Sequence, residues 1–149
     1  MTKKNVFGNA RVYGDAWVSG DARVSGNARV YGDARVSGDA WVSGDAWVSG
    51  NARVYGNARV YGNARVYGNA LIEKTSDYLT LGPAKSSARF TTAHKDSVIG
   101  VRVNCGCFSG SVSEFESAIK ETHKENPEYL RQYLAFVYVI REHFAEDLK

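Results

Sequence analysis

The sequence predicts a parallel β-solenoid over residues 5–72 and a small α+β module over residues 77–149. The first observation is a six-residue period, Val-x-Gly-(Asp/Asn)-Ala-(Arg/Trp), that runs almost without exception from Val6 to Leu71. A period of six is too short for a helical repeat and does not fit the heptads of a coiled coil. The second observation is that the period stops at Ile72, after which strand-like segments and then helix-capping patterns follow.

Each repeat contains one extended segment and one corner. Val is β-branched and favours extended backbone, so Val with its two neighbours predicts a three-residue strand that points Val inward. The Gly that follows, with Asp or Asn after it, breaks the strand because these residues tolerate a left-handed backbone. The small Ala then faces inward at the corner. Repeated strands and corners make a solenoid whose backbone hydrogen bonds run between coils.

These residues resemble the hexapeptide-repeat proteins, which fold as a left-handed parallel β-helix with an aliphatic residue at position 1 and a small residue at position 5. The resemblance covers residues 5–72, about half of the chain. It implies three repeats for each triangular coil, and therefore just under four coils. Residues eighteen positions apart should then stack on one another.

With that spacing, the residue before each Val forms vertical columns on three outer faces. Five of the eight vertical contacts pair Arg with Trp, and two pair Arg with Arg. An arginine over an indole contributes about 0.5–1 kcal/mol at an exposed site. These side chains could simply stabilise a thin Val/Ala core as cross-strand neighbours, or they could form a binding surface, since Trp, Tyr and Arg dominate binding hot spots. The candidate residues for binding a partner or an anionic ligand are Arg11, Trp17, Arg29, Arg35, Trp41, Trp47, Arg53, Tyr55, Tyr61 and Tyr67.

After a linker at residues 73–77, the sequence predicts three strands, at residues 78–81, 89–94 and 98–103. Lys95-Asp96-Ser97 suits a hairpin turn, and residues 105–110 read as a connection punctuated by glycine. About 75 residues bury only a marginal core, and a solenoid end presents unpaired strands. We therefore expect this module to pack on the last coil as a cap, or against another subunit.

Two helices should complete the module in the order β-β-β-α-α, both on one face of the sheet. Ser113-Glu-Phe-Glu116 is a capping-box pattern and predicts a helix over residues 114–123. Asn126-Pro127 predicts the start of the second helix, with Asn as the cap and Pro in the first turn. Its apolar face continues to near the C-terminus through Leu130, Tyr133, Leu134, Val137, Ile140 and Phe144.

The run DYLTLGP…FTT…IGVRVNCGCFSGSVSEFESAIKETH resembles a C-terminal module found in uncharacterised proteins of phages and prophages, often behind repeats of this kind. The resemblance covers residues 77–145 and implies a phage-related origin, with no activity attached. The matching residues are Gly82-Pro83, Gly106-Cys107-Phe108, Gly110, Phe115 and Thr122-His123.

Charge and composition limit the function classes. Residues 1–72 carry a net charge of +4, and residues 73–149 a net charge of −1. This balance tolerates an anionic partner but is too weak for a dedicated nucleic-acid binder. No signal peptide and no membrane-spanning stretch is evident, so we expect a cytoplasmic protein, in the host cytoplasm if phage-encoded. Cys105 and Cys107 are too close for an unstrained disulfide and should be reduced.

Candidate catalytic and metal sites are sparse. Many hexapeptide-repeat proteins are acyltransferases that use a His near a subunit boundary, but these repeats contain no His to act as a general base. The two cysteines with His94 or His123 could form a metal site, although thiols beside glycine also suit a buried structural position. Stacked aspartates, such as Asp15 over Asp33, could attract a cation or serve the corner turns. We predict no cofactor and no metal.

The sequence therefore favours a non-catalytic binding protein of phage or prophage type. Its partner would be a host protein such as a defence or regulatory factor, bound by the Arg/Trp/Tyr faces and the C-terminal module. We expect a homo-oligomer, a dimer or a trimer, because flat aromatic faces and a small second module both gain from burial. Two alternatives stay open: sequestration of a small anionic ligand such as a nucleotide, and an acyltransferase-like enzyme.

Overall fold

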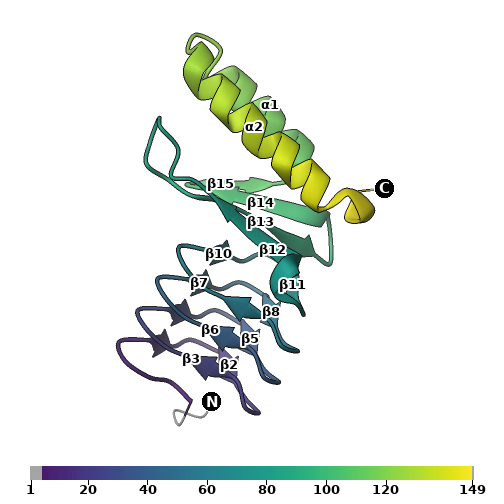
Figure 1. The fold of residues 1–149 in the computed structure, drawn as a ribbon. Coiled ribbons are helices and arrows are strands. Elements are labelled where there is room, and N and C mark those ends of the chain that lie inside the picture. The colour runs from purple at the N-terminus through teal and green to yellow at the C-terminus, as the bar shows by residue number, and fades with distance from the viewer. Residues whose placement is uncertain (1–4, 149) are drawn as a thin grey trace.

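The computed structural model describes residues 5–148 and has a parallel β-solenoid at one end and an α+β module at the other (Figure 1). The solenoid strands form three parallel sheets, in the orders β1-β4-β7-β10, β11-β8-β5-β2 and β3-β6-β9. We call their outer surfaces the first, second and third faces. The strands are β1 (Arg11–Val12), β2 (Trp17–Val18), β3 (Arg23–Val24), β4 (Arg29–Val30), β5 (Arg35–Val36), β6 (Trp41–Val42), β7 (Trp47–Val48), β8 (Arg53–Val54), β9 (Arg59–Val60), β10 (Arg65–Val66) and β11 (Leu71–Ile72).

The expected register is confirmed, because residues eighteen apart pair throughout, as Arg29 does with Trp47 and Val30 with Val48. The strands are one residue shorter than the sequence predicts. The corner turn begins immediately after Val: at one corner the Ala46 N–H donates to the Ser43 carbonyl at 3.3 Å. The residue after Val therefore belongs to a turn, although its own N–H still bonds to the next coil.

The solenoid interior is a stack of Val and Ala side chains. From Ala16 to Ile72 these residues are buried in one continuous cluster, which Tyr78 closes at the C-terminal end. Coils lie so close at the corners that glycine is required there. Gly44 has φ of +64°, and a Cβ at this position would lie 2.9 Å from the Gly62 nitrogen. The repeated Gly thus serves both the turn and the stacking of coils.

The C-terminal module is an antiparallel sheet with two helices on one face (Figure 1). The sheet order is β12-β13-β14-β15. Its core joins the inner faces of both helices to one face of the sheet, around Val103, Phe115 and Ile140. The elements are η1 (Thr75–Asp77), β12 (Tyr78–Leu81), β13 (Thr91–Asp96), β14 (Gly100–Cys105), β15 (Phe108–Gly110), α1 (Val112–Thr122), α2 (Pro127–His143) and η2 (Ala145–Asp147).

The hairpin between β13 and β14 corrects the prediction of a turn at Lys95-Asp96-Ser97. Both strands lie two residues later than predicted, and the turn occupies residues 97–99. Asp96 ends β13 because its carboxylate accepts hydrogen bonds from the backbone N–H groups of Val98 and Ile99, at 2.9 and 3.0 Å. A side-chain acceptor two residues before the turn apex therefore sets the position of the hairpin.

The predicted connection over residues 105–110 is wrong, because it contains a fourth strand. Cys105 pairs with Phe108 across a tight turn in which Gly106 has φ of +58°. The order is therefore β-β-β-β-α-α.

The first helix also begins earlier than predicted, because the capping box is Ser111 with Glu114 rather than Ser113 with Glu116. The start of the second helix at Asn126-Pro127 is confirmed: the Asn126 side chain accepts from the Tyr129 N–H at 3.2 Å.

The face of the sheet opposite the helices covers the last coil of the solenoid. In every earlier coil, strand N–H groups donate to carbonyls of the following coil, as Trp47 does to Ala64 at 2.9 Å. At the last coil, side-chain oxygens of the module accept instead: Tyr61 N–H donates to the Tyr78 hydroxyl at 3.2 Å, and Arg65 N–H to Thr92 Oγ1 at 3.0 Å. The module thus pairs backbone groups that an open end would leave unsatisfied.

Candidate functional site

All five predicted Arg–Trp contacts between coils are present as cation–π pairs, with 4.4–5.8 Å from the guanidinium carbon to the ring centroid. Trp47 lies between Arg29 and Arg65, and Trp41 lies between Arg23 and Arg59. Each indole therefore separates two positive charges that would otherwise stack directly.

The ten candidate residues do not converge on one site, because the three faces point in different directions. The second face holds a shallow hollow of about 500 Å³ that brings four of them together. The first face carries Arg11, Arg29, Trp47 and Tyr67, the second carries Trp17, Arg35, Arg53 and Tyr55, and the third carries Trp41 and Tyr61.

The arginines of the solenoid are not neutralised by carboxylates. Within residues 5–148, none of the seven forms an ion pair, although five aspartates occupy the corners of the same repeats. In the module, by contrast, most basic side chains have an acidic partner, as Arg102 has in Asp96 at 2.7 Å. The solenoid faces therefore present positive charge that is available to a bound anion.

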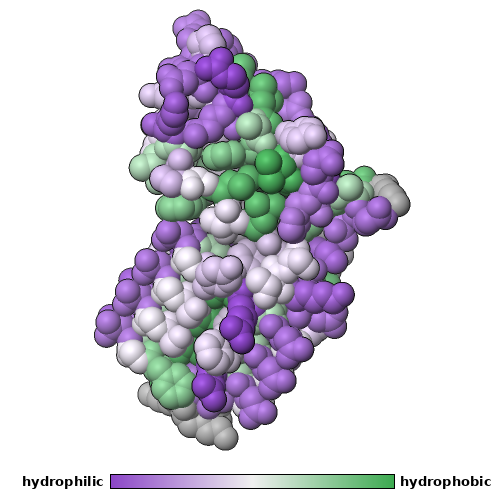
Figure 2. Space-filling view, viewed as in Figure 1, coloured by the Kyte–Doolittle hydropathy of each residue, from purple (hydrophilic) through white to green (hydrophobic). Residues whose placement is uncertain are grey.

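The surface view shows how polarity divides the two halves (Figure 2). On the solenoid, residues of intermediate hydropathy alternate with strongly hydrophilic ones, whereas apolar surface gathers mainly on the module. Five large apolar or aromatic side chains of the module are exposed, namely Val98, Ile99, Tyr138, Val139 and Leu148.

A groove of about 740 Å³ lies between the first face and the loop that joins β12 to β13. We call it the junction groove. Its volume falls within the roughly 300–1,000 Å³ that is typical of small-molecule pockets. It has two arginines and no carboxylate in its lining, which consists of Tyr31, Trp47, Ser49, Gly50, Asn63, Arg65, Tyr67, Gly68, Ala88, Arg89, Phe90 and Gly106.

Arg65 is held in place at the rim of the junction groove. Its guanidinium lies 4.4 Å above the Trp47 ring and donates from one nitrogen to the Asp45 carbonyl at 3.0 Å. Arg89 approaches from the other side, where its guanidinium lies against Gly106 so closely that a Cβ there would overlap it. The groove thus places one cation on the solenoid and one on the module.

The loop of residues 82–90 is fastened to α2 rather than to the solenoid. The Lys85 N–H donates to Gln132 Oε1 at 2.8 Å, and the Ser86 hydroxyl lies 3.2 Å from the Tyr133 hydroxyl. Ala88, in the groove wall, has φ of +58°, which costs a residue with a side chain about 1–2 kcal/mol. The neighbouring contacts hold the loop over the first face despite this cost.

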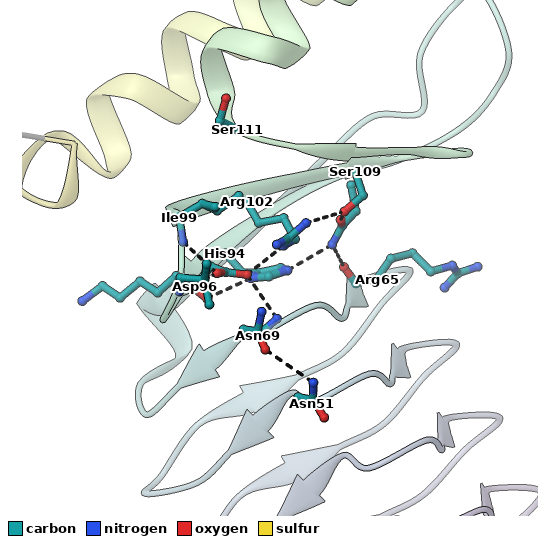
Figure 3. Close-up of polar contacts among 12 residues, drawn as sticks. Asn51, Arg65, Asn69, His94, Asp96, Ile99, Arg102, Ser109 and Ser111 are labelled. Carbon is teal, nitrogen blue, oxygen red and sulfur yellow. Dashed lines mark hydrogen bonds and ion pairs between the residues drawn. The ribbon is translucent and has the colours of Figure 1, made fainter.

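A polar network lies between the sheet and the last coil (Figure 3), with His94, Asp96 and Asn104 buried. Arg102 pairs with Asp96 through Nε and donates from Nη1 to the Ser109 hydroxyl at 3.0 Å. Ser109 in turn donates to Asn104 Oδ1 at 2.8 Å, and Asn104 Nδ2 donates to the Arg65 carbonyl at 3.0 Å. The network therefore connects β13 and β14 to the strand that carries Arg65.

His94 completes this network as a neutral imidazole. Its Nδ1 donates to the Lys95 carbonyl at 2.9 Å and its Nε2 accepts from Asn104 Nδ2 at 3.0 Å. Burial lowers the pKa of His94 to about 4, outweighing the hydrogen bond to Lys95 and the nearby Asp96 carboxylate. Burial raises the pKa of Asp96, but the Arg102 and backbone hydrogen bonds outweigh it and hold the pKa below its usual value.

The structure does not assemble the metal site considered from the sequence. Cys105 and Cys107 are free thiols, and both ring nitrogens of His94 are engaged in the network. His123 stacks on Tyr133 at 5.1 Å in the helical layer. Among residues 5–148, no group of three or more His, Cys, Asp or Glu side chains is placed to hold a metal ion.

Of the twelve residues that line the groove, ten were absent from the predicted set, among them Tyr31, Arg65 and Arg89. Tyr31 and Arg65 belong to the same columns as predicted residues, so their positions were foreseeable from the period. Arg89 lies in the module, and only the tertiary packing of the loop brings it to the solenoid.

No helix within residues 5–148 has the length and apolar character that crossing a membrane requires.

One family model matches the chain, described as the YdcK Beta solenoid repeat. Seven overlapping matches fall between residues 6 and 73, at 6–20, 16–34, 28–44, 34–50, 46–62, 52–65 and 58–73. The match supports a repeat β-solenoid protein and does not extend into the module. No curated protein and no solved structure matches the chain.

Proposed function

We propose that the chain is a non-catalytic binding protein of phage or prophage type whose partner is a host protein with an acidic surface. The observation that carries this proposal is the set of solenoid arginines without carboxylate partners, interleaved with aromatic rings. Protein interfaces are enriched in Trp, Tyr and Arg, and complementary charge steers and orients association. The phage origin and a host defence or regulatory factor as partner rest on the resemblance of the module.

The second face is the surface we assign to the partner. Arg35 stacks directly on Arg53 there, with no indole between the two charges. Trp17 is 54% exposed above them, and the hollow they share has no carboxylate in its lining. The comparable Arg11–Arg29 pair on the first face has Asp45 beside it. A partner carboxylate placed between Arg35 and Arg53 would relieve the like-charge contact of the second face.

A homo-oligomer, a dimer or a trimer, in the cytoplasm is part of this proposal. The exposed apolar side chains of the module, among them Tyr138 at 67% and Val98 at 70%, would gain from burial in a subunit contact. Sedimentation of the purified protein would test this separately, with a Tyr138→Glu variant that should shift the mass toward the monomer.

The test of the partner proposal uses the symmetry of the solenoid. Each face carries a single Trp, so Trp17→Ser/Tyr55→Ser on the second face has a matched control, Trp41→Ser/Tyr61→Ser, on the third. Host proteins that the wild type retains from bacterial lysate would be purified. Calorimetric titration would then measure the affinity of each one for the wild type, for the second-face variant and for the third-face control. We expect the second-face variant to bind at least about thirtyfold more weakly, as for hot-spot residues, and the control to bind like the wild type.

Salt supplies a second readout, because screened charges should weaken the complex as ionic strength rises. Thermal unfolding of each variant establishes that it folds. Binding that survives both substitutions, or that both substitutions abolish equally, would contradict the assignment of the second face.

A further inference from the structure

The first face contains a gap in a column of aromatic rings. The column runs Tyr13, Tyr31, Ser49, Tyr67 at the position after each Val, and the first two rings stack with centroids 5.1 Å apart and planes at 5°. Ser49 stands where the next ring would be, at the floor of the groove, and is only 7% exposed. Strands in a sheet lie about 4.8 Å apart, and Tyr31 and Tyr67 are two coils apart. The strands that carry them are therefore about 10 Å apart. A flat ring stacked at about 3.5–4 Å from each neighbour needs about 7–8 Å.

This gap lies inside the junction groove, with the edge of the Tyr31 ring against Trp47 at 6.2 Å. Neither of the other two faces has it, because their columns run Phe7, Ser25, Ser43, Tyr61 and Ser19, Ser37, Tyr55. There, no single serine has an aromatic residue as its neighbour on both sides.

The chemistry at the ends of the groove is cationic. Arg65 and Arg89 are two lining residues with no ion pair within residues 5–148, and the lining contains no carboxylate to repel an anion. The Tyr67 hydroxyl in the groove lining is a further hydrogen-bond donor, and burial raises its pKa. Arginine forks bind phosphate with two parallel hydrogen bonds, and aromatic side chains stack on bases of any sequence.

We propose that the junction groove binds a mononucleotide, with the base stacked over Ser49 between Tyr31 and Tyr67 and the phosphate held by Arg65 and Arg89. This site lies on a different face from the proposed partner surface. It is therefore independent of that proposal, and either can fail alone.

Trp47 lies in the groove wall, so its fluorescence can report binding. In a Trp17→Phe/Trp41→Phe protein it is the sole tryptophan, and this protein would be titrated with AMP, adenosine, inorganic phosphate and phosphotyrosine. We expect saturable quenching by AMP, with adenosine and phosphate each binding at least about tenfold more weakly because each lacks one half of the recognition. Equilibrium dialysis of radiolabelled AMP with the wild type repeats the measurement without the Phe substitutions.

The decisive variant is Ser49→Tyr, which fills the gap with a third stacked ring. It should keep or raise the unfolding temperature and weaken AMP binding at least about tenfold. Ser43→Tyr on the third face adds the same side chain outside the groove and should bind AMP like the wild type. An AMP affinity unchanged in a folded Ser49→Tyr protein, or no AMP binding to the wild type at millimolar concentration, would overturn the proposal. Phosphotyrosine binding as tight as that of AMP would also overturn it, by assigning the site to a phosphorylated side chain.

Discussion

Replacing Asp96 by Asn should break the contact between the solenoid and its cap at its most connected point. One carboxylate oxygen accepts from the N–H groups of Val98 and Ile99, and the other accepts from the Asn69 N–H at 3.2 Å and from Arg102 Nε at 2.7 Å. An amide has one oxygen and one NH₂ group. In either orientation of the Asn side chain, its NH₂ group would therefore face two of the four N–H donors that now bind the carboxylate. The substitution also leaves the Arg102 charge without its partner.

The magnitude follows from burial. Removing one member of a buried, hydrogen-bonded ion pair costs about 3–5 kcal/mol. The Asp96 side chain is fully buried, whereas that of Arg102 is 17% exposed and keeps its bond to Ser109. We therefore expect a loss of about 2–4 kcal/mol, less than for two fully buried charges. At about 2–4 °C for each kcal/mol in a chain of this size, the unfolding temperature should fall by about 4–16 °C.

Differential scanning calorimetry measures this change, and Glu121→Gln is the matched control. Glu121 pairs with Lys124 at 3.0 Å on the surface of the helical layer, where both side chains are mostly exposed, so no measurable change is expected. Amide hydrogen exchange should locate the damage, with faster exchange at Asn69, Val98 and Ile99. If the Asp96→Asn protein unfolded at the temperature of the control, the network would contribute nothing to capping and the reasoning would be refuted.

Three further outcomes are expected. His94 titrates at about 4 when folded and about 6.5 when unfolded, so stability should fall by about 3 kcal/mol from pH 6.5 to pH 4, and urea titrations of His94→Gln should lack that slope. Gly44→Ala should destabilise the solenoid more than Gly62→Ala in thermal melts, since both have positive φ but only Gly44 faces a neighbouring backbone within 4 Å. Tyr78→Phe should cost about 1–2 kcal/mol in urea unfolding, because it leaves the Tyr61 N–H without an acceptor, and an unchanged midpoint would contradict this.

The arrangement of the solenoid could be predicted because the number of repeats in each coil determines it. Once three repeats make a coil, every column follows from the sequence, and the five Arg–Trp contacts were predictable before any coordinates. The exact strand length was not, because the corner hydrogen bond from Ala46 to Ser43 takes the residue after Val into the turn. Periodicity reports which side chains share a face, and it does not report where hydrogen bonding changes from strand to turn.

The module was predicted less well because its strand and helix-capping patterns are short, and neighbouring residues offer alternative positions for the same element. Strand Phe108–Gly110 is short and contains two small residues, so it has no pattern of its own and forms only by pairing with Val103–Cys105. The helix start was misplaced because Ser111 and Ser113 each precede a Glu by three residues, and only the backbone at Ser111 has the extended conformation of a cap. The position of the hairpin turn was indicated in the sequence by Asp96, whose carboxylate accepts from the Val98 and Ile99 N–H groups. These bonds form only once the turn has formed, so Asp96 alone did not identify it.

The junction groove could not be predicted from either half alone, since it is a consequence of capping. A sheet laid across the last coil must match the N–H groups at its end, and Thr92 and Tyr78 fix its position by accepting from Arg65 and Tyr61. The loop that carries Arg89 projects from the edge of the sheet, and its residues 88–90 line the groove together with residues of the first face. The loop therefore borders the one aromatic column with a gap in it. A surface that stabilises the solenoid elsewhere thus becomes a cavity at this end, which is why the ligand proposal belongs to the first face and the partner proposal to the second.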